Sequence, residues 1–233
     1  MSEKTHDKVV DELFKAGAHY GYSKTRRHPS TAKYIYTTKN RVDIIDIGKT
    51  GEQLAKAESF LAELGSKGKI VLFVGVKPEA RDVVRSTAEA MGMPFVVERW
   101  VGGILTNWSE VKKRIAKLED LKAKKEAGEL DKYTKKERLL IDEEIAKMHK
   151  FFSGLVSMKK MPDAMFVVDP KREHIAVTEA QKMGIPVLGI LNTDNDMKSI
   201  EYPILANDSS VSSITYFMEK ISEAYRSSVA KSE

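Results

Sequence analysis

A charged stretch within residues 99–150 constrains the fold of this chain more than any other feature. Lysine and glutamate alternate there with aliphatic residues that recur every three or four positions, such as Val111, Ile115 and Leu118. This spacing places the aliphatic residues on one side of a helix and leaves the rest charged. Because so narrow an apolar stripe does not suit the face of a sheet, we expect two antiparallel helices that project from the body of the protein.

Capping signals mark the ends of both predicted helices. Asn107, with Glu110 three residues later, predicts the start of the first helix, and Gly128 predicts its end. Thr134 and Glu137 have the spacing of a capping box at the start of the second helix. We expect the second helix to add a looser apolar side to the same seam: Leu139, Leu140, Ile145, Met148 and Phe152.

A nearly uncharged junction leads into this hairpin, from Arg99 to Trp108. We expect Trp100 to pack beneath the hairpin rather than to stack on a ligand. Two adjacent glycines in the junction supply backbone freedom or close approach. The predicted junction residues are Arg99, Trp100, Gly102, Gly103 and Asn107.

The rest of the sequence alternates between short apolar runs and amphipathic helices. Residues 70–75 and 163–169 are continuous apolar runs typical of strands buried on both faces. This alternation predicts an α/β fold with a parallel sheet of about five strands covered by helices. We expect one α/β domain, with an N-terminal helix and a basic loop, at residues 1–104 and 154–233, and a coiled-coil hairpin inserted at residues 105–153.

A basic segment near the N-terminus is the second charged feature. Between Leu13 and Val42 there is no aspartate or glutamate, and lysines and arginines alternate with tyrosines. Cations that meet phosphates, beside rings that stack on unpaired bases, are typical of RNA contact, whereas an exposed loop over core tyrosines is the alternative. We expect this glycine-rich loop to be mobile until it binds RNA. The predicted RNA-binding residues, including three on the first hairpin helix, are Lys24, Arg26, Arg27, His28, Lys33, Tyr34, Lys39, Arg41, Lys112, Lys113 and Arg114.

No segment predicts a catalytic or metal site. The chain has no cysteine, and its five histidines are isolated from one another. Residues 48–50 (Gly-Lys-Thr) lack the earlier glycine of a phosphate-binding loop, since residue 43 is aspartate. Asp169 and Asn192 follow predicted strands, but no neighbouring Ser, Thr or Lys completes a known catalytic set. We therefore expect no enzyme activity, no cofactor and no metal.

Charge and hydropathy limit the functional classes and cellular locations that fit this sequence. A net charge of +5 over 233 residues, with a pI of about 9.1, is a modest excess that matters only where it is concentrated. The polar N-terminus lacks the apolar core of a signal peptide, and no stretch approaches the roughly 20 apolar residues of a membrane span. We expect a cytoplasmic protein that does not contact a membrane.

Three motifs carry a resemblance to a known family. They are residues 17–21 (Gly-Ala-His-Tyr-Gly), 99–107 (Arg-Trp-Val-Gly-Gly-Ile-Leu-Thr-Asn) and 162–170 (Pro-Asp-Ala-Met-Phe-Val-Val-Asp-Pro). In order and spacing they resemble the bacterial small-subunit ribosomal protein S-two family, and the likeness covers about residues 8 to 225. The resemblance implies a flavodoxin-like, doubly wound parallel sheet with an inserted coiled-coil hairpin. It also implies a structural role in the small ribosomal subunit and no reaction.

The resemblance further implies particular partners. They are small-subunit rRNA between the head and body of the subunit, neighbouring small-subunit proteins, and the large mRNA-binding protein that the family helps to recruit. A homo-oligomer is not expected. The sequence departs from the family at Tyr22, where a histidine is usual, at Arg27, where an aromatic residue is usual, and at Asn192, where an aspartate is usual.

Two other functional classes stay open at this point. One is an enzyme that uses the crevice at the carboxyl edge of the sheet. The other is a protein-binding adaptor whose interface is the hairpin.

Overall fold

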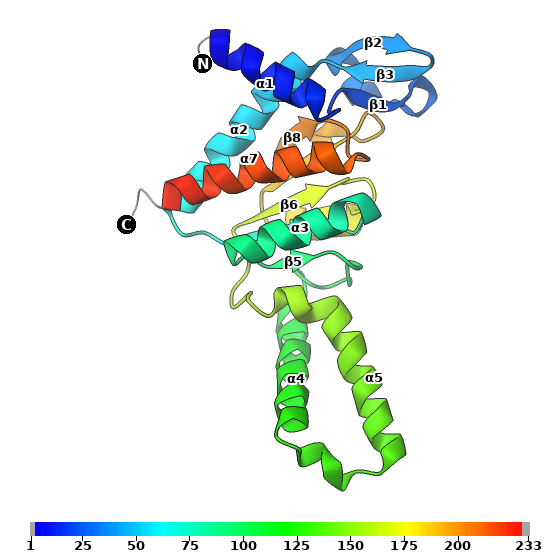
Figure 1. Ribbon diagram of the computed structural model, residues 1–233, viewed down its shortest axis with the longest axis vertical. Helices are drawn as coiled ribbons and strands as arrows, with labels where there is room; N and C mark the ends of the chain where they lie inside the picture. The colour runs from blue at the N-terminus through cyan, green and yellow to red at the C-terminus, as the bar shows by residue number, and fades with distance from the viewer. Residues whose placement is uncertain (1–2, 230–233) are drawn as a thin grey trace.

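The computed structural model describes residues 3–229, which are organised around one parallel sheet (Figure 1). The sheet has five strands in the order β5-β4-β6-β7-β8. The chain enters this sheet at β4, steps outward to β5 and then continues on the other side of β4 through β6, β7 and β8, which is the flavodoxin-like, doubly wound order. The predicted fold class is confirmed. The strands are β4 (Val71–Val74), β5 (Phe95–Val96), β6 (Ala164–Val168), β7 (Val187–Leu191) and β8 (Tyr202–Leu205).

Helices cover both faces of this sheet, and each face buries its own core. In β4, Val71 and Phe73 point into the first core, and Leu72 and Val74 point into the second, as the two-residue period of a strand requires. Burial on both faces explains the continuous apolar runs in the sequence. The first core is closed by α1 (Glu3–Lys15), α2 (Ile47–Ser66), α3 (Pro78–Met91) and α7 (Val211–Val229), and the second by α6 (His174–Lys182) and the base of the hairpin.

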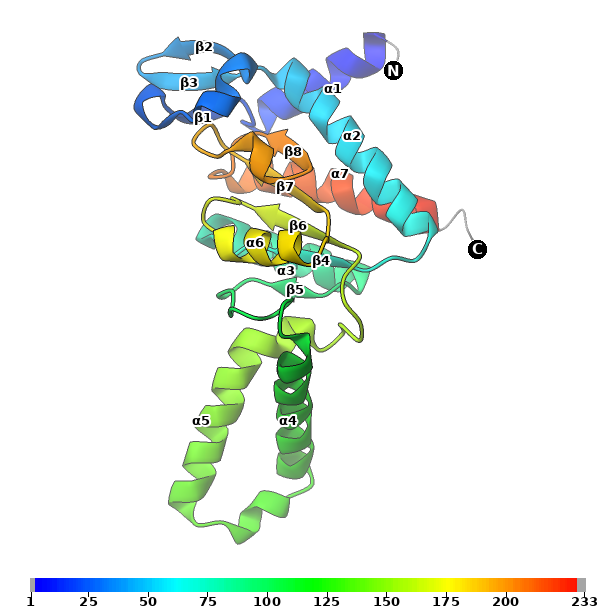
Figure 2. The same cartoon turned by 180° about the vertical axis from the view of Figure 1, so that it is seen from behind.

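The helical hairpin leaves the sheet beyond β5 and projects away from it (Figures 1 and 2). Its helices α4 (Trp108–Glu126) and α5 (Lys135–Phe152) are joined through the 3-10 turn η3 (Glu129–Lys132). The left-handed Gly128 and the capping box of Thr134 and Glu137 are both present, as predicted. Asn107 occupies the N-cap position of α4, but its side chain makes no capping hydrogen bond.

The apolar seam of the hairpin is shorter than predicted. Leu139 and Leu140, which we expected in the seam, are 59% and 56% exposed. The two helices diverge toward the tip in both views (Figures 1 and 2). The prediction for the two leucines is therefore wrong. The seam is confined to the half next to the sheet: Val111, Ile115, Leu118, Ile145, Met148 and Phe152.

A small antiparallel sheet carries the basic segment and lies beyond β8 (Figures 1 and 2). Its strands pair in the order β1-β3-β2. We call residues 20–45 the basic module. A predicted loop is thus a folded unit made of β1 (Tyr20–Ser23), the 3-10 turns η1 (Lys24–Arg26) and η2 (Pro29–Tyr34), β2 (Ile35–Lys39) and β3 (Val42–Ile45).

The remaining elements are two 3-10 turns, η4 (Ser153–Leu155) and η5 (Met197–Ser199). Within residues 3–229, no helix combines the length and the apolar character needed to cross a membrane.

Candidate RNA interface and hairpin junction

The basic module is anchored to the loop after β7 through the fully buried Thr193. The Tyr22 N–H donates to Thr193 Oγ1 at 2.9 Å, and the His28 N–H and the Thr31 hydroxyl donate to the Thr193 carbonyl at 2.8 and 3.0 Å. Gly21 permits this approach, because a Cβ there would lie 2.6 Å from Thr193 Cγ2. These long-range bonds oppose our expectation of a segment that is mobile until it binds RNA.

Arg27 points into the module. Its guanidinium donates two hydrogen bonds to the Asp43 carboxylate, the one from Nε at 2.6 Å, and another to the Thr38 hydroxyl at 2.9 Å. Burial raises the pKa of Asp43, but the hydrogen bonds from Arg27 and Thr38 lower it further, so its net pKa lies below the ordinary value. Arg27 therefore stabilises the interior of the module, at a position where the family resemblance leads one to expect an aromatic side chain.

Two other predicted RNA-binding residues meet acids from the loop after β7. Arg26 Nη2 lies 3.3 Å from Asp194 Oδ2, and His28 Nδ1 lies 3.8 Å from Asp196 Oδ1. The Arg26 side chain is still 57% exposed. The absence of acids between Leu13 and Val42 led us to expect that these cations have no countercharge, and this is wrong, because acids distant in sequence neutralise part of the charge.

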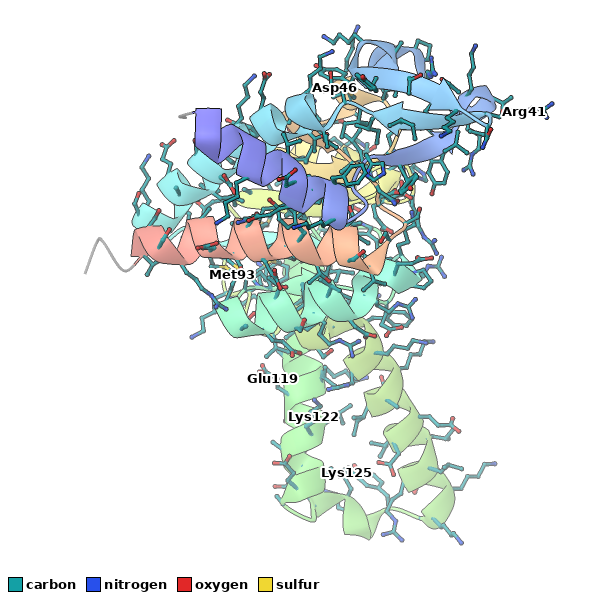
Figure 3. All side chains as sticks on the ribbon, turned by 45° about the horizontal axis from the view of Figure 1, so that its top comes forward. Arg41, Asp46, Met93, Glu119, Lys122 and Lys125 are labelled. Atoms are coloured by element: carbon teal, nitrogen blue, oxygen red, sulfur yellow. The ribbon has the colours of Figure 1, made fainter. Side chains whose placement is uncertain are left out.

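Lys24, Lys39 and Arg41 come together at the outer end of the module, and we call them the outer cluster. The Lys24 N–H donates to the Arg41 carbonyl at 2.9 Å, and Lys39 precedes the turn that joins β2 to β3. In that turn Asn40 and Arg41 have φ angles of 51° and 63°, which residues other than glycine adopt infrequently. Figure 3 shows Arg41 at the far end of the small sheet. All three cations are exposed, and none forms an ion pair within residues 3–229.

Lys33 and Tyr34 face a different neighbour, the start of α2. Lys33 Nζ lies 5.0 Å from the centre of the Tyr34 ring, and Lys49 of α2 donates to the Lys33 carbonyl at 2.7 Å. Tyr34 is half-buried and packs against the second core. Its ring therefore contributes to packing, as the alternative interpretation of the tyrosines proposed.

The other predicted RNA-binding residues, Lys112, Lys113 and Arg114, lie on α4. The hairpin extends beyond β5, on the opposite side of the central sheet from the basic module (Figures 1 and 2). Lys113 pairs with Glu110 at 2.6 Å. The predicted RNA-binding residues thus form two separate surfaces. Arg114 lines a groove of about 630 Å³ at the base of the hairpin together with three other cations, Arg99, Lys117 and Lys147.

The junction is held by Glu179, a buried residue of α6. Its carboxylate accepts hydrogen bonds from Trp100 Nε1 at 3.0 Å, from the N–H groups of Gly103 at 2.7 Å and Leu105 at 3.0 Å, and from the Thr106 N–H and hydroxyl, both at 3.2 Å. Burial raises the pKa of Glu179, but these hydrogen bonds lower it further, so its net pKa lies below the ordinary 4.5. Trp100 is buried in the second core, as expected.

Only one of the two junction positions requires glycine. Gly103 has a φ of +94°, in the region that favours glycine, and this conformation turns its N–H toward Glu179. A Cβ on Gly102 would meet nothing within 4 Å, and its φ lies outside that region. Our expectation that both glycines are required is supported for Gly103 and not for Gly102.

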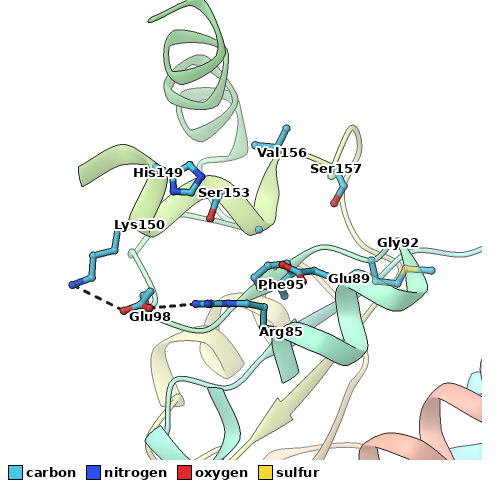
Figure 4. Close-up of a pocket in the computed structure, with 12 residues that line it drawn as sticks. Arg85, Glu89, Gly92, Phe95, Glu98, His149, Lys150, Ser153, Val156 and Ser157 are labelled. Atoms are coloured by element: carbon cyan, nitrogen blue, oxygen red, sulfur yellow. Dashed lines mark hydrogen bonds and ion pairs between the residues drawn. The ribbon is translucent and has the colours of Figure 1, made fainter. Parts of the chain in front are cut away.

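A second carboxylate, Glu98, links α3 to α5 at the surface (Figure 4). It lies 3.4 Å from Arg85, 3.7 Å from Arg81 and 4.0 Å from Lys150. Arg85, Glu98 and Lys150 line a groove of about 700 Å³. Because partly exposed ion pairs contribute about 1 kcal/mol or less, we expect Glu179 to hold the hairpin more strongly than Glu98.

Local sequence patterns do not reveal the role of Glu179, because its partners lie more than 70 residues away, Thr106 at a separation of 73 and Trp100 at 79. One local signal was present. Glu179 shares the inward side of α6 with Ala176 and Ala180, both of which are fully buried. A carboxylate on the apolar side of a helix needs a hydrogen-bonding partner, so this position pointed to a buried acceptor.

Replacing Glu179 by glutamine should lower the free energy of unfolding by about 3 kcal/mol, because the amide has one acceptor oxygen and directs N–H groups at donors. Urea unfolding measures this change. Since the pKa of Glu179 is lower in the folded chain than in the unfolded chain, its contribution to stability is complete above about pH 4.5. That contribution is lost as the pH falls through the folded pKa. The variant should therefore lose less stability on acidification than the wild type. Equal unfolding curves for Glu179→Gln and the exposed control Glu119→Gln would contradict this account.

Alanine at the junction glycines should have unequal effects. Gly103→Ala should destabilise the chain by about 1 to 2 kcal/mol because of its left-handed backbone, and Gly102→Ala should change stability by less than about 0.5 kcal/mol. Thermal unfolding of the two variants checks this difference. Equal losses would show that the left-handed backbone is not what the junction requires.

Comparison with known proteins identifies the family. The model of the ribosomal protein S2 family matches residues 13–228. The small ribosomal subunit protein uS2 of Thermus thermophilus is 41% identical over 91% of this chain and 83% of that protein. The uS2 proteins of Coprothermobacter proteolyticus and a Picosynechococcus species are 41% and 38% identical, over 93% and 91% of this chain and 81% and 83% of theirs. Together with the doubly wound sheet, these matches show that the chain belongs to the ribosomal protein S2 family.

Proposed function

We propose that this chain is a structural constituent of the small ribosomal subunit, that it acts in the cytoplasm and that it supports translation. The observation that carries the proposal is the family match over residues 13–228, together with relatives that are themselves small ribosomal subunit proteins. The proposal assigns no reaction to the chain.

The proposed ligand of the basic module is small-subunit rRNA. The outer cluster presents three exposed cations at one end of the module, and phosphate contacts supply most of the affinity of such interfaces. Tyr36, on the neighbouring strand β2, is 77% exposed and offers a ring on which an unpaired base can stack. Arg26 adds a fourth, partly exposed cation. Arg27 and Tyr34 are left out, because the first pairs with Asp43 and the second packs against the core.

The hairpin is the second proposed contact. Lys112, Lys113 and Arg114 are consecutive on α4, so they point in different directions and at most two can face one partner. We place rRNA phosphates there, with neighbouring small-subunit proteins nearby. The finer features, a position between head and body and help in recruiting the large mRNA-binding protein, rest on the family resemblance.

The enzyme alternative is less well supported than a structural role. At the carboxyl edge of the sheet, where a ligand would bind in a fold of this kind, Lys77 lies 3.1 Å from Asp208 and 3.5 Å from Asp169. Lys77 pairs with these two acids and also donates a hydrogen bond to Tyr22 of the basic module. Turnover of any small ligand bound at that edge would revive the alternative.

Removing two cations of the outer cluster should weaken RNA binding. Lys39→Ala with Arg41→Ala should reduce the affinity for in vitro transcribed small-subunit rRNA about tenfold at ~0.1 M salt. It should also lower the log–log salt slope by about 1.8, or 0.9 per phosphate contact. Filter binding over a salt series measures both quantities.

The matched control removes two exposed cations, Lys56 of α2 and Lys67 directly after its end, and so changes the net charge by the same amount. It should retain the wild-type salt slope. If both double variants lose the same affinity, binding reflects net charge, and the proposed interface is wrong.

A further inference from the structure

A buried cation lies between the basic module and the central sheet. Lys77 follows β4, and its side chain is only 8% exposed. Its amine donates to the Tyr22 hydroxyl at 3.2 Å and to Ser209 Oγ at 3.0 Å, and it lies 3.1 Å from Asp208 Oδ2 and 3.5 Å from Asp169 Oδ2. An ammonium group taken out of water needs such partners. Tyr22 is the one that belongs to the basic module.

The carboxylates around Lys77 are themselves firmly placed. Asp208 is fully buried and accepts a hydrogen bond from Asn192 at 3.0 Å. Asp169 has a φ of +62°, a conformation that persists in residues other than glycine where the surroundings enforce it. Burial lowers the pKa of Lys77, but the charge of Asp208 and the Tyr22 hydrogen bond raise it further, so the amine is charged at neutral pH. The Tyr22 hydroxyl is thus held by a fixed cation.

The Tyr22 ring in turn supports a predicted RNA-binding residue. The guanidinium carbon of Arg26 lies 4.3 Å from the centre of that ring, which is cation–π geometry. Asp194 Oδ2 also lies 3.3 Å from Nη2 of the same guanidinium. Arg26 is therefore fixed at two points while 57% of its side chain stays exposed. Its free N–H groups have a defined direction, as recognition of a phosphate requires.

We propose that Lys77 and Tyr22 are positioning residues for RNA binding, which do not touch RNA themselves but hold Arg26 in the orientation that meets a phosphate. This inference rests on the proposed rRNA-binding function and assigns part of the affinity to a buried lysine. Unsupported, the arginine would sample many rotamers and lose that entropy on binding.

The test is a double-mutant cycle on RNA binding with Tyr22→Phe and Arg26→Gln. Tyr22→Phe keeps the ring and removes the hydroxyl's hydrogen bonds to Lys77 at 3.2 Å and to Ser209 Oγ at 2.9 Å. It should weaken binding to transcribed small-subunit rRNA about fivefold. Arg26→Gln should weaken binding about tenfold and lower the salt slope by about 0.9. Because the tyrosine acts through the arginine, the double variant should bind like Arg26→Gln alone.

Two results would overturn the inference. One is multiplication of the two effects, about fiftyfold in the double variant, and the other is wild-type affinity for Tyr22→Phe. Tyr20→Phe is the matched control, since it removes a hydroxyl from an exposed tyrosine of the same module that the proposed interface does not use, and it should bind like the wild type. Tyr22→Phe is preferred to a Lys77 variant, because removing the lysine would leave two acids without a countercharge. Thermal unfolding verifies that Tyr22→Phe is folded.

The double variant of Lys39 and Arg41 distinguishes failure of this inference from failure of the proposed function. If that variant binds weakly and Tyr22→Phe binds normally, the positioning role fails alone. If both bind like the wild type, the rRNA-binding proposal fails with it.

Discussion

The position of the hairpin depends on one buried carboxylate. Glu179 accepts five hydrogen bonds from the junction, and they come from backbone and side-chain groups spread over residues 100–106. A buried charge is tolerated only when its hydrogen-bonding capacity is filled, so each donor must be in place at once. This requirement fixes the path of the chain as it leaves β5, and hence the direction in which α4 begins. Gly103 adopts its left-handed backbone within this constraint.

The central sheet lies between two charged surfaces. The hairpin extends beyond its β5 edge, and the basic module lies beyond β8 (Figure 2). At the carboxyl ends of the strands, where related folds bind small ligands, this chain uses Thr193, Lys77 and Asp208 to dock its own basic module. The edge of the sheet at which related folds bind ligands is therefore occupied here by the attachment of the basic module. That arrangement is consistent with a component of a large assembly, which must present fixed surfaces to several partners.

Local sequence patterns predicted the fold well and the site only in part. The buried strands and the ends of the hairpin helices depend on neighbouring residues, as the capping box of Thr134 shows. The inward pairing of Arg27 with Asp43 and the role of Glu179 depend on contacts that tertiary folding creates, and periodicity does not carry them. Leu139 and Leu140 have the spacing of seam residues, but the divergence of the two helices exposes them. Pattern identifies which residues can pack, and the path of the backbone decides which ones do.

The most direct test of a ribosomal role is sedimentation of the tagged full-length chain from lysate through a gradient, first at low and then at high salt. We expect the protein to migrate with small ribosomal subunits and to be released as salt rises, because contacts between exposed cations and rRNA phosphates would supply much of the affinity. Sedimentation as a free monomer or small oligomer at both salt concentrations would contradict it, and would redirect attention to the carboxyl edge of the sheet.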